Sequence, residues 1–433
     1  MLGLTFEHST YLAPRVFHLV VLNDDPKNQI YKLNYAYYVY MEPISSEVSR
    51  DFSRYIPNDI WQEIISILPI CSALRMCVSE RFTELVYISV RKIDFDSVKH
   101  RKYYIHSNTD SYLRLWRFTR LTELNISNHS VFCKDIAKFT SLTSLSASNN
   151  LGLGNKDICG LVNLTHLNIS GTCINDEGIS SLTNLVTLTA CAMYNDGITN
   201  AGVRDLVNLQ YLRTDCDKIS DLSACDQLQK LYVDDNTSYI TGESLRRLTA
   251  LVSLKLRHND NVTDDDLSIM TNLRELSLCS NGTISDIGIC TLTNLTSLDV
   301  SYSNINDISH LHQLVELKAI DSAIMCSLAS LTNLTTLIIG RLHTRDYHIE
   351  ISRLTTLTSL VFEYDTYTSE SIRGLVLMRN LDIFYAAYGH WDISHMPNLE
   401  TIYVHQPFMT YTGGSPKLRV IDNTSDIRLA QDT

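Results

Sequence analysis

A single phrase recurs along most of this chain and limits what the chain can fold into. The phrase has the form Leu-x-x-Leu-x-apolar, and consecutive copies stand about 21 residues apart. Fifteen copies are marked by their first leucine, here named the anchor: Leu121, Leu142, Leu164, Leu185, Leu209, Leu228, Leu251, Leu273, Leu295, Leu314, Leu334, Leu357, Leu381, Leu399 and Leu418. A lone unit would expose its leucine face, so neighbouring units must stack to form a continuous core. The chain from residue 113 onward is therefore predicted to be a solenoid.

Each copy combines a short strand with a tight turn. In "LTSLDVS", residues 295–301, Leu298 and Val300 alternate with polar residues, which is the period of a strand with one buried face. Apolar residues also stand three and six positions before each of the first fourteen anchors, as Ile179 and Leu182 do before Leu185. This spacing predicts a 3-10 or one-turn helix, because a repeat of about 21 residues leaves little room for a longer one.

The units resemble leucine-rich repeats, whose pattern is L-x-x-L-x-L-x-x-N, over about three quarters of the chain. The resemblance implies an α/β fold: a curved parallel sheet with short 3-10 or helical turns on its convex side, over residues 113–405, with the last repeat and a C-terminal cap over 406–433. The final Asn, which bonds buried backbone groups in that family, is matched by Asn150, Asn236, Asn259 and Asn281. Other copies have Thr172, Asp217, Ser303, Ser322 and Asp365 at this position. These side chains satisfy some of the same backbone groups, so the ladder is predicted to be irregular.

Composition narrows the class of partner and the compartment. The chain of 433 residues has 36 Lys and Arg against 48 Asp and Glu, a net charge of −12, which argues against nucleic-acid binding. We find neither a run of apolar residues long enough to span a membrane nor the pattern of a secretory leader. The 11 cysteines are odd in number and form no C-x-x-C pair, which favours reduced thiols. We therefore expect a cytoplasmic or nuclear protein, or both, with no nucleic-acid or membrane partner.

Potential N-glycosylation sequons are frequent, including "NLT" at Asn163, Asn294 and Asn333. The repeat phrase itself generates them, and an Asn on a packed solenoid is a poor glycan site. An extracellular glycosylated receptor is the alternative, and it would require a leader and oxidised cysteines.

Residues 55–95 differ from the repeats because their apolar spacing is helical. Ile60, Ile64, Ile67 and Leu68 fall on one face of a helix that Pro57 introduces and Pro69 ends. A second helical stripe follows at Leu74, Val78, Phe82 and Leu85. A plain interpretation is a helical cap that covers the first core edge of the solenoid.

The segment "IPNDIWQEIISILP…LRMCVSERFTEL" also resembles the F-box. Ile56 and Pro57 match its opening Leu-Pro, and Ser79, Arg81 and Phe82 match its closing signature. Ile56 departs from the usual Leu, and the span between Leu68 and Phe82 is about one residue shorter than in the family. The resemblance implies an all-α module that binds a Skp-type adaptor, and through it a cullin-RING ubiquitin ligase. Adaptor-binding residues would be Ile56, Pro57, Ile60, Ile64, Leu68, Leu74, Val78 and Phe82.

Two further segments flank this module. Residues 1–54 contain two strand-like runs around the turn "NDDPKN", which predicts a β-hairpin appendage. Residues 96–112 are assigned to a linker.

A partner is expected on the strand side of the solenoid. The outward positions are the third, fifth and seventh counted from each anchor, and the fifth positions form one column, here named the central column. The column begins with the small polar residues Asn125, Ser146, Asn168 and Thr189. Aromatic, aliphatic and charged residues follow, which are typical of binding patches. Predicted target-binding residues are Arg213, Tyr232, Lys255, Asp299, Lys318, Ile338, Val361, Tyr385 and Tyr403. The alternative is that the C-terminal segment folds over these strands as a cap.

The sequence does not favour an enzyme, a metal site or a cofactor site. His310 and His312 flank the buried Leu311 and are expected to face solvent, and Asp264 to Asp266 precede an apolar triplet, where acids cap helical turns. The glycines at 152–154 lack the context of a phosphate-binding loop. The sequence therefore predicts a substrate-recognition subunit of an SCF-type ubiquitin ligase that binds its adaptor through residues 55–95 and a protein target through the concave face. A leucine-rich-repeat scaffold or inhibitor without a ligase partner is the alternative.

Overall fold

The computed structural model divides the chain into two compact units, Met1–Val90 and Arg91–Thr433. The residues that it describes are 62, 65, 80–94, 118–128, 133–191, 197–216, 218–233, 240–340, 347–363, 368–383, 390–405, 410–414 and 417–422. The predicted appendage of residues 1–54, the linker of residues 96–112 and most of the predicted adaptor-binding module lie outside them.

In the first unit, helix α4 spans Glu80–Ser89. Leu85, Val86 and the following Val90 are buried, as the predicted helical stripe ending at Leu85 requires. The hydroxyl of Ser89 donates a hydrogen bond to the carbonyl of Leu85 one turn earlier. Ile65 is fully buried, although it is not one of the residues of the predicted stripe through Ile64 and Leu68.

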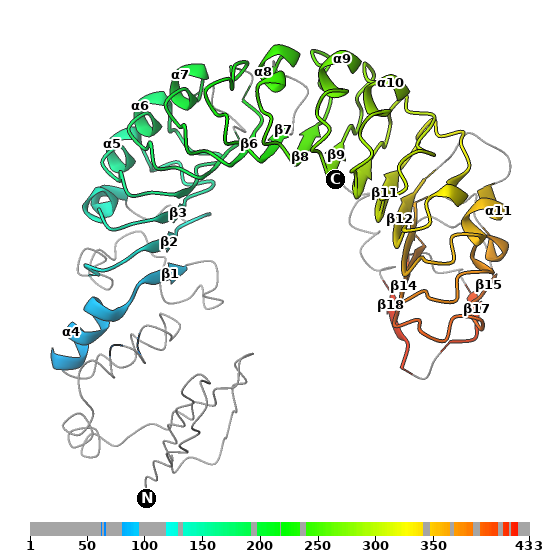
Figure 1. Ribbon diagram of the computed structural model, residues 1–433. Coiled ribbons are helices and arrows are strands. Elements are labelled where there is room, and N and C mark those ends of the chain that lie inside the picture. The colour runs from blue at the N-terminus through cyan, green and yellow to red at the C-terminus, as the bar shows by residue number, and fades with distance from the viewer. Residues whose placement is uncertain are drawn as a thin grey trace, which may run out of the picture. The chain divides into compact units, whose positions relative to one another are not determined.

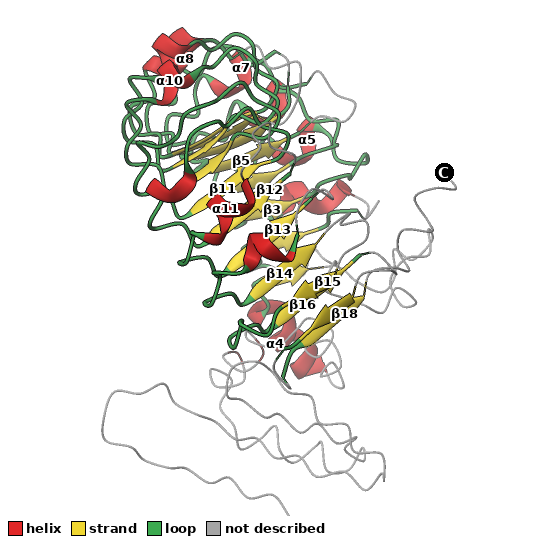
Figure 2. Ribbon diagram, turned by 90° about the vertical axis from the view of Figure 1, so that its right-hand side faces the viewer, coloured by secondary structure: helices red, strands yellow, loops and turns green. Residues whose placement is uncertain are grey.

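The second unit is built on one parallel sheet of 16 strands. The strands are β1 Lys92–Asp94, β2 Glu123–Asn125, β3 Ser144–Ser146, β4 His166–Asn168, β5 Thr187–Ala190, β6 Tyr211–Thr214, β7 Lys230–Val233, β8 Ser253–Leu256, β9 Glu275–Ser277, β10 Ser297–Asp299, β11 Glu316–Ala319, β12 Thr336–Ile339, β13 Ser359–Phe362, β14 Asn380–Ile383, β16 Thr401–Val404 and β18 Arg419–Asp422. They stack as one continuous ladder (Figure 2). Strands β15, His390–Asp392, and β17, Thr410–Thr412, form a separate parallel pair. The predicted parallel solenoid is confirmed.

The sheet begins before the first anchor. Ile93 of β1 stands opposite Leu124 of β2, in the same register as every later pair of leucines. The sequence predicts that residues 92–94 belong to the helical module. It does not predict this strand because only Ile93 there fits the repeat pattern.

Short helical turns lie on the outer side of the arc that the strands follow (Figure 1). They are η2 Cys133–Lys138, α5 Asn155–Ile158, α6 Asp176–Ile179, α7 Asn200–Val203, α8 Gly242–Arg246, α9 Asp264–Leu267, α10 Asp286–Ile289, η3 Leu328–Ser330, α11 Tyr347–Ser352 and η4 Ser369–Ile372. These 3-10 and one-turn or slightly longer segments confirm the prediction from the apolar triplets. Asn175, Thr199 and Ser285 cap three of them by accepting a hydrogen bond from a backbone N–H in the first turn.

The helical turns of successive repeats are tied together by acidic or amide side chains. Asp264, the first residue of α9, accepts hydrogen bonds from the backbone N–H and the hydroxyl of Ser285 in the next repeat, at 2.8 and 2.6 Å. Asp176 accepts the same two bonds from Thr199. Glycine makes room for the carboxylate: a Cβ on Gly288 would lie 2.5 Å from Oδ1 of Asp264. Asp264 and Asp266 of the "TDDDL" turn therefore have structural roles, since Asp266 accepts from the backbone N–H of Thr263 at 2.9 Å.

The predicted Asn ladder is present on the side of the core where each strand ends. Asn150, Asn259 and Asn281 are fully buried. Each follows a residue with positive φ, such as Ser280 at 57°, which turns the chain inward. The Nδ2 of Asn281 donates to the carbonyl of Asn259, 2.6 Å away, and its Oδ1 accepts from the backbone N–H of Ile284 at 3.0 Å.

The ladder is irregular, as predicted. The hydroxyl of Ser303 bonds only the carbonyl of Val300, at 2.7 Å. The hydroxyl of Ser322 is buried without a partner. Asn236, Asp217 and Asp365 lie outside the described residues.

Candidate protein-binding face

The strand register brings eight of the nine predicted target-binding residues into one column. Tyr232 stands between Arg213 and Lys255 on neighbouring strands. Lys318 stands between Asp299 and Ile338 in the same way. Ile338 is followed by Val361 and, two strands later in the sheet, by Tyr403. These residues are all partly or fully exposed.

Tyr385 is the ninth, and its assignment to the column is wrong. The column position on β14 belongs to Asp382, which pairs with Val361 on one side and Tyr403 on the other. The anchor of this repeat is Met378, three residues before Leu381, so counting from Leu381 moved the fifth position to Tyr385. Tyr385 itself lies outside the described residues. At the last repeat Ile421, and not Asp422, pairs with Tyr403.

The first four strands after β1 present a small polar surface. Asn125 donates to the carboxylate of Asp94 at 2.9 Å, and the hydroxyls of Ser127 and Ser146 lie 2.8 Å apart. These side chains satisfy one another and offer little apolar area. The predicted change of character after Thr189 is therefore visible in the contacts.

Strands β6 to β8 carry an interlocked group that we name the aromatic patch: Tyr211, Arg213, Tyr232, Ser253 and Lys255. The rings of Tyr211 and Tyr232 meet edge to face with centroids 5.4 Å apart. The Nζ of Lys255 lies 4.3 Å from the centroid of the Tyr232 ring, a cation–π contact. The hydroxyls of Tyr232 and Ser253 lie 3.3 Å apart. Because Tyr232 is held from three sides, little rotamer entropy remains to be lost when a partner binds.

Strands β10 to β14 carry a second group that we name the acidic patch: Asp299, Lys318, Ile338, Val361, Glu363 and Asp382. Burial raises the pKa of the Glu363 carboxyl above its usual value; Lys318 opposes the rise, and the nearby acids Asp321, Asp382 and Asp299 add to it. Burial likewise raises the pKa of Asp382, although His405 opposes the rise. The Nε2 of His405 lies 2.8 Å from Oδ1 of Asp382. The patch therefore holds partly desolvated carboxyl groups beside an aliphatic floor.

Sequence reasoning missed Tyr211, Glu363 and His405 as members of the face. Tyr211 is at a third position, and Glu363 and His405 are at seventh positions. The alternation of inward and outward residues along each strand therefore predicts that all three belong to the face. The predicted target-binding residues come from the fifth positions alone, which is why these three are missing from them.

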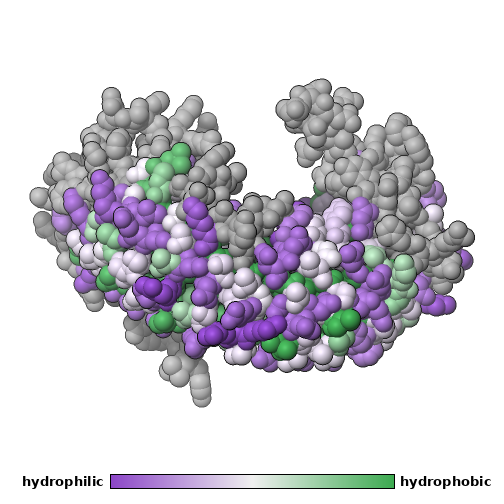
Figure 3. All heavy atoms as spheres, turned by 90° about the horizontal axis from the view of Figure 1, so that it is seen from above, coloured by the Kyte–Doolittle hydropathy of each residue, from purple (hydrophilic) through white to green (hydrophobic). Residues whose placement is uncertain are grey.

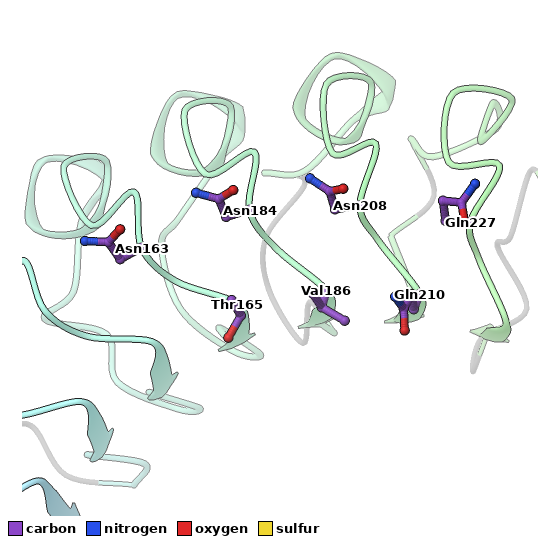
Figure 4. A pocket seen from close by; sticks show the side chains of 7 residues that line it. All are labelled: Asn163, Thr165, Asn184, Val186, Asn208, Gln210 and Gln227. Atoms are coloured by element: carbon purple, nitrogen blue, oxygen red, sulfur yellow. The ribbon is translucent and has the colours of Figure 1, made fainter.

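A shallow groove of about 560 Å³ lies at the N-terminal ends of β4 to β7 (Figure 4). It is lined by Asn163, Thr165, Asn184, Val186, Asn208, Gln210 and Gln227. The Nδ2 atoms of Asn163, Asn184 and Asn208 donate to carbonyls of the preceding repeats at 2.8 to 3.0 Å. These asparagines therefore stack the repeats, and Asn163 belongs to one of the sequons.

No group of three or more His, Cys, Asp or Glu side chains in the described part of the chain is arranged to hold a metal ion. Nε2 of His310 lies 3.1 Å from the carbonyl of Ile289, and Nδ1 of His312 lies 3.4 Å from that of Ser330. The backbone around Gly154 starts helix α5, with its N–H bonded to Asp157. None of the described helices is long and apolar enough to cross a membrane.

Comparison with known proteins identifies the fold. No family model and no curated protein match the chain. Among solved structures, a leucine-rich-repeat protein of Leptospira interrogans is similar over 82% of this chain and 90% of its own, with 18% identity and a TM-score of 0.52. The fold is a leucine-rich-repeat solenoid. The functional domain of InlJ from Listeria monocytogenes is similar over 75% of this chain and 71% of its own, with 21% identity and a TM-score of 0.47.

The leucine-rich-repeat fold accounts for Arg91 onward, but the predicted adaptor-binding residues fall outside the description. Phe82 lies in α4, and Ile56, Pro57, Ile60, Ile64, Leu68, Leu74 and Val78 lie outside the described residues. The F-box resemblance of residues 55–95 stays a prediction.

Proposed function

We propose that the leucine-rich-repeat solenoid is a recognition unit that binds a protein partner on its strand side, over β6 to β16. One observation carries the proposal: aromatic, aliphatic and charged side chains that solvation alone does not require lie in register at the fifth positions there, whereas the fifth positions of β2 to β5 are small polar residues. The outer side is the weaker candidate. Hydrophilic residues predominate on it, and its hydrophobic residues are scattered (Figure 3).

The face is tested by site-specific photo-crosslinking in the host cell. A photo-reactive amino acid replaces Tyr232 or Ile338 on the face, or Ile287, which is 66% exposed on α10. We expect a common crosslinked protein at the first two positions and not at the third. Crosslinks at Ile287 alone, or a different set of proteins at each position, would contradict the proposal.

The finer proposal is that this partner is the target of an SCF-type ubiquitin ligase in the cytoplasm or nucleus. The F-box resemblance of residues 55–95 supports it, since that module binds a Skp-type adaptor and a cullin-RING ligase in the family. The solenoid would then hold the target while the ligase, and not this chain, performs the chemistry.

Adaptor binding is tested by co-purification with a Skp-type adaptor of the host. The variant Pro57→Ala, Ile60→Ala, Leu68→Ala removes the matched apolar residues. The control variant Val162→Ala, Val207→Ala, Ile287→Ala removes exposed apolar residues of the solenoid. We expect capture by the wild type and the control and loss in the first variant, with both variants folded by circular dichroism. Equal capture by all three, or no capture at micromolar concentration, would reject the adaptor role.

A scaffold or inhibitor without a ligase is the second candidate. In that case residues 55–95 would supply only the terminal unit that a solenoid needs over its first core edge. The two candidates share the binding face and differ only in adaptor capture.

A further inference from the structure

The charged side chains of the binding face are sorted by sign along the solenoid. At the third, fifth and seventh positions of β6 to β8, the residues that the structure describes include four bases, Arg213, Lys230, Lys255 and Arg257, and one acid, Asp215. At the same positions of β9 to β14, the described acids are Glu275, Asp299, Glu316, Glu363 and Asp382, beside the single base Lys318. Surface charges of mixed sign are normally interspersed, so this division is a property of the face.

The acidic half contains carboxyl groups that the solenoid itself leaves poorly compensated. Asp382 has a side chain only 26% exposed, and the described ion pair that it makes is with His405, which is charged only when protonated. The carboxyl of Glu363, just after β13, is affected by the negative charges of Asp321, Asp382 and Asp299, and the positive charge of Lys318 offsets them in part. An incoming cation would find carboxylates that are already partly stripped of water.

The surface of the face between these carboxylates is aliphatic. Ile338 and Val361 are paired in register and partly exposed. A Lys or Arg side chain has an apolar stem and a charged head, so it fits a site that offers both surfaces. On the basic half, Arg213 and Lys255 are exposed beside the tyrosine rings, which suits a partner with acidic and aromatic groups.

We propose that the face binds a protein segment of complementary charge order, with acidic side chains over β6 to β8 and basic side chains over β10 to β14. This rests on the proposed binding face and adds the chemistry of its partner. From Arg213 on β6 to Asp382 on β14 there are eight strand spacings, roughly 38 Å at about 4.8 Å each. An extended segment of about 12 residues covers that span. Charge order thus fixes which end of the partner lies over which end of the solenoid.

Two synthetic peptides of identical composition separate charge order from net charge. The sorted peptide has four Glu-Ser repeats followed by four Lys-Ser repeats, and the mixed peptide has four Glu-Ser-Lys-Ser repeats. Both are neutral, so attraction to a chain of net charge −12 is the same for each. Fluorescence anisotropy at low and physiological salt measures their affinities for the full chain. We expect the sorted peptide to bind about fivefold to tenfold tighter, since each exposed ion pair contributes little.

Matched variants locate the effect. Glu363→Gln, Asp382→Asn neutralises the acidic half, and Arg213→Gln, Lys255→Gln neutralises the basic half. The control Glu243→Gln, Asp265→Asn removes two exposed acids from the outer turns α8 and α9. Either face variant should abolish the preference for the sorted peptide, and the control should keep it. Equal binding of the two peptides by the wild type, absence of binding included, overturns the inference, and so does a control that loses the preference.

Photo-crosslinking keeps this result separate from the proposed function. If the peptides bind equally while Tyr232 and Ile338 positions crosslink a common protein, the binding face stands and the charge order is rejected. If a partner is found, the segment crosslinked at the Tyr232 position should be acidic and the one crosslinked at the Ile338 position basic. The reverse assignment also overturns the inference.

Discussion

Three residues at one repeated position, Asn281, Ser303 and Ser322, should differ in stability cost although all three are buried. Asn281→Ala is the informative change. Its Nδ2 satisfies the Asn259 carbonyl, and its Oδ1 satisfies the N–H groups of Thr283 and Ile284 at 3.1 and 3.0 Å. Asn281 and Asn259 are fully buried and Ile284 is 1% exposed, so water cannot replace the bonds to Asn259 and Ile284.

The magnitude follows from the groups left without partners. An unsatisfied buried backbone group costs about 1–3 kcal/mol, and Asn281→Ala leaves at least the Asn259 carbonyl and the Ile284 N–H unpaired. We expect a loss of about 3 kcal/mol in the free energy of unfolding. Ser303→Ala removes one bond, to the Val300 carbonyl, and should cost about 1 kcal/mol. Ser322→Ala removes a hydroxyl that has no partner and should be neutral or slightly stabilising.

Urea unfolding followed by circular dichroism measures the three values, and hydrogen exchange shows where protection is lost. Because repeats interact mainly with their neighbours, the Asn281 variant should lose protection around β8 to β10 first. Equal costs for the three alanine variants, or a cost under about 1 kcal/mol for Asn281→Ala, would refute the ladder argument. Either result would mean that the leucine columns alone fix the loop.

Three further predictions use other contacts. Gly288→Ala should cost about 1–2 kcal/mol in chemical unfolding, because its Cβ would displace the Asp264 carboxylate from Ser285; Gly160→Ala, where a Cβ meets nothing within 4 Å, is the control and should be close to neutral. Glu363→Gln should raise the Tm at neutral pH. Because the pKa of this carboxyl is higher in the folded chain than in the unfolded chain, its ionised form destabilises the folded state when the pH is above the folded pKa. This destabilisation disappears as the pH falls below the pKa of the unfolded chain, so the advantage of Gln should vanish in acid. Burial, with smaller effects of Asp221 and Asp226, raises the pKa of the Cys225 thiol to about 11, so iodoacetamide should label the exposed Cys159 and Cys173 in the native protein and Cys225 only after unfolding, as mass spectrometry of the peptides would show.

The repeat period predicts most of the fold, and the predictions that were wrong concern single repeats. In "LVLMRNLDIF", apolar residues stand at 375, 378 and 381, so three frames of the same phrase overlap. Pairing with neighbouring strands decides between them, and it puts Leu381 opposite Leu360. A slip of three residues therefore exchanged Tyr385 for Asp382 in the face. At the last repeat the register puts Lys417, and not Leu418, at the anchor position, so Ile421 takes the place in the column that counting from Leu418 gives to Asp422.

Other features of the structure depend on contacts between residues of different repeats, and the sequence of one repeat does not show these contacts. The Asp264 and Ser285 bonds join residues one repeat apart, and the Gly288 contact exists only because the carboxylate lies between them. The raised pKa of Glu363 arises from burial and from charged residues on three other repeats. A strand pattern gives the direction of a side chain, and only stacking gives its neighbours.

The separation of face and core explains why the acidic patch is informative about function. Core positions are filled by leucine columns that bury completely, so outward residues can be exchanged without altering the stacking. A stable solenoid would then be expected to place small polar residues at every fifth position, as β2 to β5 do. Glu363 and Asp382 instead stand partly desolvated, with raised pKa values, beside the partly exposed Ile338 and Val361. An arrangement that costs stability in the free chain is accounted for most simply by a bound state in which a cation covers the carboxylates.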